Sequence, residues 1–354
     1  MCLSPIPWDG LWTSRHALCT EFAAMGHDVV FVDPPRNLLQ RGPAHARRNR
    51  PERLRVAEPP PRLPYGVLDG IPGVARAVIA ANAAVYARFV ARQATSTDGP
   101  VMVLNSFMPV LGYLVADRLP DAVHVYHRAD ALEGFPTYKP YYSQLEARVL
   151  QQARVVLCVS PAVRASIADI RPDAVVLPNA VDSSRFADAR PDPRLAALPR
   201  PKIALIGVVD DRTDAGLLEA AAKAGCLVVA GPVHIELPAG TKELGPIPPE
   251  EVPGVLAACD VALLCYRRDF AGDALKTYEY LAAGLPVVAS DFAGLHSLRT
   301  HLTVVSTPSA MTAAVQAAAA GRTADGDRAR RAVAAANSWR SRSEELLDMV
   351  GAAA

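Results

Sequence analysis

The chain has 354 residues, of which 51% are hydrophobic and 21% are charged, and its formal net charge is +1 at pH 7. This length exceeds that of one typical domain and predicts two. The balanced charge gives no reason to expect nucleic acid as a partner, and no apolar run approaches the roughly 20 residues of a membrane-spanning helix.

The six cysteines are scattered and form no CxxC pair. They are therefore expected to be small buried residues in a reducing compartment, and not a disulfide framework or a zinc site. Near the N-terminus, Pro5, Pro7, Trp8 and Asp9 stand where a secretory signal peptide would have its apolar segment. Both observations predict a cytoplasmic protein.

The first half of the chain alternates apolar strands with helices. Strands are predicted at residues 2–4, 29–32, 101–104, 123–126, 155–159 and 175–177, and helices at 13–25, 73–94 and 141–152. The first strand is short, which fits either a stunted strand or a start codon placed late. Polar residues such as His127 and Asp130 follow the strands, and ligands bind at that edge of a parallel sheet.

A basic, proline-containing segment interrupts this alternation. Residues 36–62 contain eight arginines against two glutamates. The composition predicts a loop. It is either a solvated loop or a contact for an anionic acceptor or for anionic lipid at the inner face of the membrane.

The second half repeats the alternation after a break. Residues 185–201 contain four prolines and predict a linker between an N-terminal domain (1–184) and a C-terminal domain (202–335). Strands are predicted at residues 203–206, 227–230, 261–265 and 285–289, followed by a helical tail (310–350) with breaks at Gly321 and Gly326. The fold class is therefore α/β, with two doubly wound, Rossmann-like domains facing across a cleft.

One stretch, residues 269–290, has the pattern of a binding site. A polar loop ends at Asp273, which is a favourable N-cap for a helix over residues 274–283. Lys276 and Glu279 are three positions apart and share one face of that helix. A helix N-terminus beside a glycine loop favours a phosphate. The alternative is a surface helix carrying a Lys/Glu pair.

The residues of this stretch carry a resemblance. The run KTYEYLAAGLPVV from Lys276, with Pro178-Asn179-Ala180-Val181-Asp182 upstream, resembles the retaining glycosyltransferases of family 4, which have the GT-B fold. Gly26-His27 and Ser160-Pro161 fit the same order, so the resemblance spans nearly the whole chain. It is nearest to the bacterial branch found in surface-polysaccharide and teichuronic-acid clusters. In GT-B proteins a final helix, here within residues 336–354, crosses back to the first domain.

The resemblance implies transfer of a hexose from a UDP-, GDP- or dTDP-sugar to a hydroxyl of a glycan, a lipid-linked sugar or a small molecule. It also implies retention at the anomeric carbon, no metal ion and no tightly bound cofactor. Two alternatives stay open: a nucleotide-sugar epimerase or hydrolase on the same fold, and a catalytically silent subunit that binds a nucleotide sugar. The sequence does not specify the base, the sugar, the acceptor or the oligomeric state.

By the same resemblance, Glu279 would accept hydrogen bonds from the donor ribose, and Lys276 and Arg212 would lie near the diphosphate. Ile247 would lie beside the base. His127 and Asp130 would face the transferred sugar or the acceptor, although a lone histidine also fits a hydrogen-bond network in the core. The remaining donor-binding candidates are Gly10, Gly207, Asp269, Gly272, Asp273, Ala274 and Leu275.

The chain departs from the family pattern at one position. Family members often carry an acidic residue eight positions before the final glutamate, where this chain has Ala271. Asp269 and Asp273 flank it, so the contact with the sugar is either moved to one of them or lost. Asp210-Asp211 and Asp325-Gly326-Asp327 are not interpreted as metal ligands, because the first lies in a strand-to-helix loop and the second lies in the helical tail.

Overall fold

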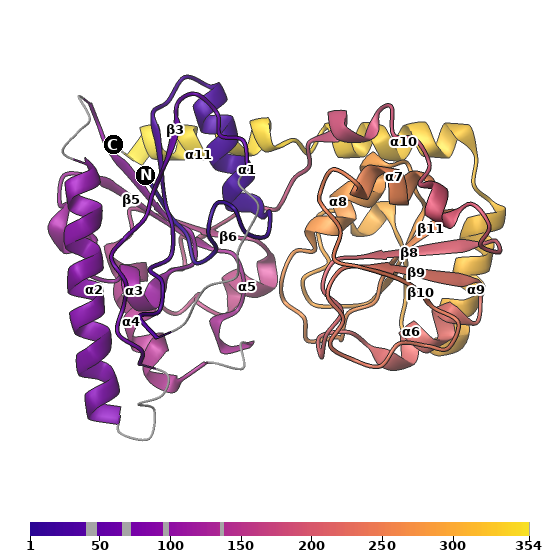
Figure 1. Ribbon diagram of the computed structural model, residues 1–354, viewed down its shortest axis with the longest axis horizontal. Coiled ribbons are helices and arrows are strands. Elements are labelled where there is room, and N and C mark those ends of the chain that lie inside the picture. Colours follow the sequence, from indigo (N-terminus) through magenta and orange to yellow (C-terminus); the bar gives the residue numbers. More distant parts are fainter. Residues whose placement is uncertain (40–47, 66–71, 95–98, 135–137, 354) are drawn as a thin grey trace. The chain divides into compact units, whose positions relative to one another are not determined.

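The computed structural model describes residues 1–39, 48–65, 72–94, 99–134 and 138–353. The chain forms two compact units (Figure 1): unit 1 contains Met1–Leu177 and Arg342–Ala354, and unit 2 contains Pro178–Ser341. Residues 185–201, which the sequence predicts as a linker, lie within unit 2. Helix α11 (Trp339–Ala353) begins in unit 2 and belongs to unit 1 from Arg342 on.

In the described part of the chain, unit 1 contains a seven-stranded parallel sheet with the order β3-β2-β1-β4-β5-β6-β7. Its strands are β1 (Cys2–Leu3), β2 (Val29–Val32), β3 (Leu54–Ala57), β4 (Met102–Asn105), β5 (Val123–Arg128), β6 (Val155–Cys158) and β7 (Val175–Val176). The order reverses at β1, so the carboxyl ends of β1 and β4 flank the switch point at which ligands bind in such sheets.

Helices connect these strands, as is usual in a parallel sheet, except between β2 and β3, where the described residues contain none. They are α1 (Ser14–Ala24), α2 (Pro72–Ala94), α3 (Pro109–Gly112), α4 (Pro140–Gln152) and α5 (Pro161–Ala165), with the 3-10 turns η2 (Ala116–Arg118) and η3 (Leu132–Gly134). The predicted helices at 13–25, 73–94 and 141–152 are confirmed to within two residues at their described ends. Residues 40–47 of the arginine-rich segment lie outside the described residues, and residues 54–57 of that segment form β3 instead of a loop.

Helix α2 corrects the expectation that no segment is long and apolar enough to span a membrane. An 18-residue window within residues 73–94 has a mean hydropathy of 1.4, so the segment passes that test by length and composition. One face of the helix is buried in unit 1 at a helical spacing, through Ala75, Ile79, Ala83, Tyr86, Ala87 and Val90. An apolar face of this kind is typical of a core helix.

Unit 2, again within the described residues, contains a six-stranded parallel sheet with the order β10-β9-β8-β11-β12-β13. The strands are β8 (Lys202–Ile206), β9 (Cys226–Ala230), β10 (Lys242–Gly245), β11 (Val261–Leu264), β12 (Val287–Ser290) and β13 (Thr303–Val305). The helices and 3-10 turns are η4 (Ser183–Phe186), η5 (Pro193–Leu195), α6 (Ala215–Ala222), α7 (Val252–Ala257), α8 (Leu275–Ala282), η6 (Arg299–His301), α9 (Pro308–Ala320) and α10 (Ala324–Ala335). The prediction of two doubly wound α/β domains is confirmed.

The continuous apolar strands of unit 2 supply two hydrophobic cores, one on each face of the sheet. In β8, Ala204 and Ile206 join a core that includes α7, α8 and Ala334 of α10. Ile203 and Leu205 alternate with them and join a core with α6 and α9. Successive side chains of a strand point to opposite faces, so a strand covered on both sides is apolar at every position.

Three edge strands and two helix boundaries differ from the sequence prediction. Strands β3, β10 and β13 were not predicted. They lie at sheet edges, where side chains are more exposed to solvent, and they include exposed polar residues such as Arg55 and Glu243, so they lack a continuous apolar run. Gly326 does not break the tail, since it lies in the first turn of α10 and its N–H donates to Thr323 Oγ1 at 3.2 Å. Asp273 is not an N-cap: Ala274 occupies that position and provides no side-chain cap.

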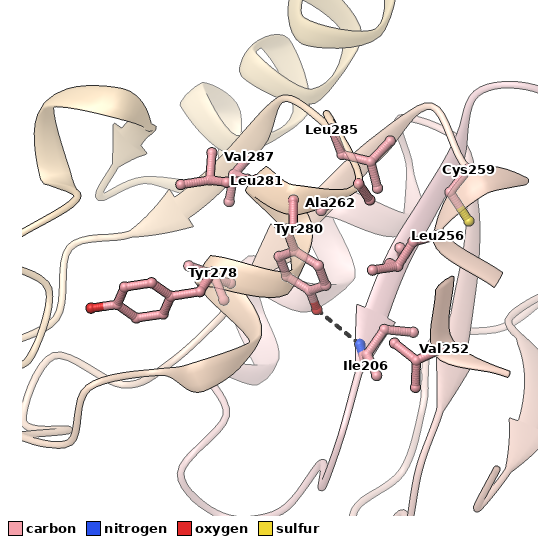
Figure 2. Close-up of a cluster of buried hydrophobic side chains, with 14 of the residues drawn as sticks. Ile206, Val252, Leu256, Cys259, Ala262, Tyr278, Tyr280, Leu281, Leu285 and Val287 are labelled. Carbon is pink, nitrogen blue, oxygen red and sulfur yellow. Dashed lines mark hydrogen bonds between the residues drawn. The ribbon is translucent and has the colours of Figure 1, made fainter. Parts of the chain in front are cut away.

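Tyr280 fixes helix α8 to the end of β8 (Figure 2). Its ring is fully buried, and its hydroxyl oxygen accepts a hydrogen bond from the N–H of Ile206 at 2.9 Å. Strand β11 pairs with β8 only as far as Ala204. Beyond that pair, the hydroxyl of Tyr280 provides the acceptor for the N–H of Ile206. The hydrogen bond holds the helix that carries Lys276 and Glu279 against the central strand.

We expect Tyr280→Phe to lower the free energy of unfolding by about 1–3 kcal/mol, because it leaves a buried N–H without an acceptor. Urea denaturation of the full chain measures this. Tyr141→Phe is the matched control, since the buried hydroxyl of Tyr141 has no hydrogen-bond partner among the described residues and its removal should cost nothing. Equal effects of the two substitutions would contradict the role given to Tyr280.

Candidate functional site

The first part of the candidate site is the loop that follows β8 in unit 2. Gly207 has φ +97°, and Gly231 packs so closely against it that a Cβ on Gly231 would lie 2.2 Å from the carbonyl oxygen of Gly207. Only glycine permits this approach of two backbone segments. A Cβ on Gly207 would lie 3.5 Å from Nζ of Lys276, so the ammonium group stands directly beside the end of the central strand.

Lys276 is the second residue of α8. Its Nζ also lies 5.1 Å from the ring centroid of Tyr266, within range of a cation–π contact. The backbone N–H groups of Leu275 and Lys276 donate to no acceptor in the described part of the chain. A lysine and an uncapped helix N-terminus therefore supply positive charge and free donors at one place, which suits a phosphate group.

Arg212 extends from the same loop and is held by Asp210. Its Nε lies 2.9 and 3.0 Å from the two carboxylate oxygens, and one terminal nitrogen lies 2.7 Å from Oδ2. Burial by itself raises the pKa of Asp210, but hydrogen bonds from Arg212 and the charge of Lys276 outweigh it, so the pKa lies below its ordinary value. In the sequence, Asp210 was considered as a metal ligand and that interpretation was rejected. In the structure, its carboxylate orients Arg212.

Glu279 lies one turn along α8 from Lys276 and is half-buried. Burial raises the pKa of its carboxyl, while the charges of Arg185 and Lys276 lower it and only partly offset that rise. Among the described residues, no donor forms a hydrogen bond with this carboxylate, and neither oxygen is sealed from solvent. It is thus an open hydrogen-bond acceptor in a partly desolvated setting, as a ligand with hydroxyl groups would require.

Asp273 is engaged by the protein itself. Its Oδ2 accepts hydrogen bonds from the N–H of Asn179 at 2.7 Å and from the hydroxyl of Tyr278 at 2.9 Å. In return, Nδ2 of Asn179 donates to the carbonyl of Asp273 at 2.8 Å. The sequence presented Asn179 only as part of a family motif. Its contacts show that the start of unit 2 fixes the loop before α8.

The rest of that loop is arranged by close packing. A Cβ on Gly272 would lie 2.7 Å from the ring of Phe270, and one on Gly294 would lie 2.0 Å from the carbonyl oxygen of Gly272. Phe270 stacks on Tyr266 with centroids 4.2 Å apart. Asp269 is 78% exposed in its side chain and lies 3.5 Å from Nε of Arg267. Of the two aspartates beside Ala271, one therefore faces solvent and the other is committed to Asn179.

Ile247 lies just beyond β10, on a loop connected to the glycines described above. The carbonyl of Gly245 accepts a hydrogen bond from the N–H of Gly231 at 2.8 Å, and Gly245 has φ +67°. Ile247 is partly buried against the core that includes α8. The structure thus connects the loops after β8, β9 and β10 at one edge of the sheet.

The candidates in unit 1 lie at the carboxyl edge of its own sheet. Gly10 occupies a tight turn, since its N–H donates to the carbonyl of Pro7 at 2.9 Å and a Cβ would lie 3.0 Å from that oxygen. His127 was predicted to follow β5, but it lies within the strand and is 2% exposed. Asp130 is half-buried, and its Oδ1 accepts a hydrogen bond from the N–H of Ala131 at 2.8 Å.

His127 is neutral in the folded protein. Burial, with a smaller contribution from Arg15, lowers its pKa to about 3. The unfolded chain binds this proton near pH 6.5 and the folded chain does not, so stability is lost as the pH falls below that value. His16, whose pKa burial lowers to about 4, acts in the same direction, whereas burial raises the pKa of Asp33 to about 6 and acts oppositely.

We expect His127→Asn to reduce the stability lost between pH 7 and pH 5 by up to about 1.4 kcal/mol per pH unit below 6.5. Urea denaturation at the two pH values measures it, and the contributions of His16 and Asp33 cancel in the comparison with wild type. His301→Asn, at an exposed position, is the matched control. An unchanged pH dependence in His127→Asn would refute the assignment.

No group of three or more His, Cys, Asp or Glu side chains that could hold a metal ion occurs within the described residues. The six cysteines are free thiols. In unit 2, Gly207 lies beside Lys276, and Arg212 and Ile247 lie on the loops after β8 and β10. The candidates Asp273, Ala274, Leu275, Lys276 and Glu279 lie on helix α8 and the loop before it. Sequence reasoning missed Asp210, Tyr266, Asn179 and Arg185, because their roles depend on which way each side chain points.

The sequence matches two protein families over most of its length. Residues 8–185 match the family described as Glycosyltransferase Family 4, and residues 212–348 match the family described as Glycosyl transferase-like. A comparison with curated proteins found no match.

Solved structures with the same fold cover nearly the whole chain. Sucrose-phosphate synthase from Thermosynechococcus elongatus is 16% identical, with a TM-score of 0.71 and 100% and 99% of the two chains covered. HepE from Anabaena, in complex with UDP and glucose, is 14% identical, with a TM-score of 0.66 and coverage of 99% and 98%. An α,α-trehalose-phosphate synthase (UDP-forming) from Burkholderia vietnamiensis is 13% identical, with a TM-score of 0.71 and coverage of 99% and 99%. The structural similarity, with TM-scores of 0.66 to 0.71, establishes the fold.

Proposed function

Because the chain belongs to glycosyltransferase family 4, we propose that it transfers a hexose from a nucleotide-diphosphate sugar to a hydroxyl group of its acceptor, without a metal ion and with retention at the anomeric carbon. In the reaction, the bond between the anomeric carbon and the diphosphate oxygen breaks. A bond forms from the acceptor oxygen to that carbon, and the acceptor proton passes to the departing diphosphate.

The arrangement of Lys276 and Glu279 on α8 carries this proposal. At about 1.5 Å rise per residue, Glu279 lies roughly 7 Å along the helix from its N-terminus, which is about the distance from a nucleotide's phosphates to its ribose hydroxyls. The N-terminus offers the unpaired N–H groups of Leu275 and Lys276 to the phosphates. Glu279 offers an unoccupied carboxylate to the ribose.

The groups near Gly207 would lower the barrier to departure of the diphosphate. Negative charge builds on the leaving oxygen in the transition state, and fixed cations and N–H groups aimed at it stabilise that state more than the ground state. Lys276 lies beside Gly207, and Asp210 holds Arg212 in a defined orientation at the same loop. The base would lie at Ile247, which is partly buried on the loop after β10.

In unit 1, we assign the acceptor to the carboxyl edge of the sheet. His127 is neutral and buried there, and Asp130 lies three residues further along the chain at the same edge. HepE, which shares the fold, was solved with UDP and glucose, in agreement with a nucleotide-sugar donor for this chain. The nucleotide panel described next is designed to identify the base and the sugar of the donor.

A panel of UDP, GDP and dTDP and their sugars, each added to the full chain with EDTA present, tests the proposal. A ligand bound by the folded chain alone raises the free energy of unfolding by RT ln(1 + [L]/Kd), about 2.7 kcal/mol at a hundredfold excess over Kd. We expect one base to raise the unfolding temperature strongly and the others weakly. Proton NMR of the product then reads the anomeric configuration. No stabilisation by any nucleotide at millimolar concentration would contradict the proposal.

A further inference from the structure

Unit 1 contains a buried arginine without a carboxylate partner. Arg15, the second residue of α1, is 5% exposed, and its one hydrogen bond among the described residues runs from Nε to Oγ of Ser106 at 3.1 Å. Arg128, which is fully buried in the same unit, differs: its guanidinium pairs with Glu146 at 2.9 Å and with Glu133 at 3.0 Å. Within the described residues, one buried arginine is neutralised by carboxylates and the other has no carboxylate counter-ion.

The acidic side chains of the neighbouring loop are engaged elsewhere. Asp9 accepts a hydrogen bond from the N–H of Arg48 at 2.8 Å, and Asp33 accepts one from the N–H of Trp8 at 2.8 Å. A guanidinium stays charged in proteins, and a buried charge needs a partner of opposite sign. An anion supplied from outside the chain would provide one, and Arg15's terminal nitrogens are neither paired nor sealed from solvent.

Ser106 and His127 orient a further donor at the same edge. The guanidinium can only donate, so Ser106 Oγ accepts from Arg15. The serine proton is then directed to the remaining neighbour of that oxygen, Nδ1 of His127, at 3.5 Å. A neutral imidazole that accepts at Nδ1 carries its proton on Nε2. For Nε2 no protein partner exists within the described part of the chain, so it is an available N–H donor.

The N-terminus of α1 adds more donors. The backbone N–H groups of Ser14 and Arg15 donate to no acceptor among the residues that the structure describes, although both residues are buried. They lie at the positive end of an eleven-residue helix. Guanidinium nitrogens, an imidazole N–H and two backbone N–H groups thus collect where β1, β4 and β5 end, and no carboxylate of the described residues pairs with Arg15.

We propose that Arg15, Ser106 and His127, with the N-terminus of α1, form a subsite for an oxyanion on the acceptor, a phosphate or a carboxylate group. The proposal rests on the proposed function and names its acceptor class: a hydroxyl compound that also bears a negative charge. A guanidinium binds both kinds of oxyanion through paired N–H groups. The donor's own diphosphate is the alternative source of this chemistry, because unit 2 already offers it Lys276, Arg212 and α8.

The test is thermal unfolding of the full chain with inorganic phosphate at constant ionic strength, after saturation with UDP so that the groups on α8 are occupied. We expect phosphate to stabilise the wild type and to bind Arg15→Gln at least tenfold more weakly, with an intermediate loss in Arg15→Lys. Arg88→Gln is the matched control, since Arg88 is exposed on α2 and makes no ion pair in the described residues. Without ligand, Arg15→Gln should unfold no earlier than wild type, because it removes an unpaired buried charge.

A second arm separates the two sources. Glucose 6-phosphate and glucuronate should compete with phosphate in the wild type, and glucose should not. UDP, added alone, should stabilise wild type and Arg15→Gln equally. Phosphate binding of equal strength in wild type and Arg15→Gln would overturn the subsite. A loss of UDP binding in Arg15→Gln would move the oxyanion to the donor and overturn the acceptor assignment. Failure of UDP to stabilise any variant, with phosphate still dependent on Arg15, would uphold the subsite and count against the proposed function.

Discussion

Glu279→Ala is expected to weaken binding of the nucleotide-sugar donor by roughly 10- to 100-fold. A hydrogen bond to a charged group contributes about 1.5–3 kcal/mol, and each 1.4 kcal/mol corresponds to about a factor of ten in affinity. The carboxylate has no hydrogen-bond partner in the described part of the chain, so its substitution removes ligand contacts without breaking a contact within the protein. Calorimetric titration with the nucleotide identified by the panel measures the loss.

Replacing Glu279 with a neutral side chain should weaken donor binding without lowering the stability of the folded chain. Burial raises the pKa of Glu279 in the folded chain. The folded state therefore holds the proton to higher pH than the unfolded state, and stability falls as the pH rises through that window. At neutral pH, Glu279→Gln should be at least as stable as wild type while binding the donor more weakly. Glu219→Gln, on the exposed face of α6, is the matched control. Unchanged donor affinity in Glu279→Ala would remove the glutamate from the site.

Lys276→Ala is expected to lower kcat by roughly 10²- to 10³-fold, the range found when one preorganised group that stabilises transition-state charge is removed. Its Nζ stands beside Gly207, and the negative charge on the leaving oxygen increases as the diphosphate departs, beyond the charge that the bound donor already carries. Binding of the intact donor should therefore weaken by a much smaller factor. Steady-state kinetics and a direct titration of donor binding, carried out on the same preparation, separate the two effects.

Two further variants sharpen this experiment. Lys276→Arg keeps the positive charge and should recover part of the rate, whereas Lys223→Ala, at an exposed position after α6, should leave the rate unchanged. A loss of donor affinity with kcat unchanged would show that Lys276 contributes equally to ground state and transition state.

The central strands could be predicted from the sequence, whereas the edge strands β3, β10 and β13 could not; the edge strand β7 was predicted at residues 175–177. Residues 29–32 and 261–264 are continuous apolar runs, because both faces of those strands are covered. Strand β10, Lys-Glu-Leu-Gly, lies at an edge, and half of its residues are charged. Its position follows from pairing with β9, which is a tertiary contact that local sequence does not encode.

The same limit applies to the candidate site. Lys276 and Glu279 were assigned because helical spacing places them on one face, a property that holds for any α-helix. Asp273 was misassigned because a residue with good capping chemistry found better partners in Asn179 and Tyr278. The distance from Asn179 to Asp273 in the chain is 94 positions, and nothing in either neighbourhood predicts that they meet.

The two hydrogen bonds between Asn179 and Asp273 limit which residues of the loop before α8 can change during evolution. Replacing Asp273 alone would strand the N–H of Asn179, so the two positions should change together or stay fixed together. Gly272 and Gly294 are likewise confined by the backbone contact between them. Asp269, whose side chain is 78% exposed, is less confined than these residues and can vary more readily. Changes in this loop during evolution would therefore arise most readily at Asp269.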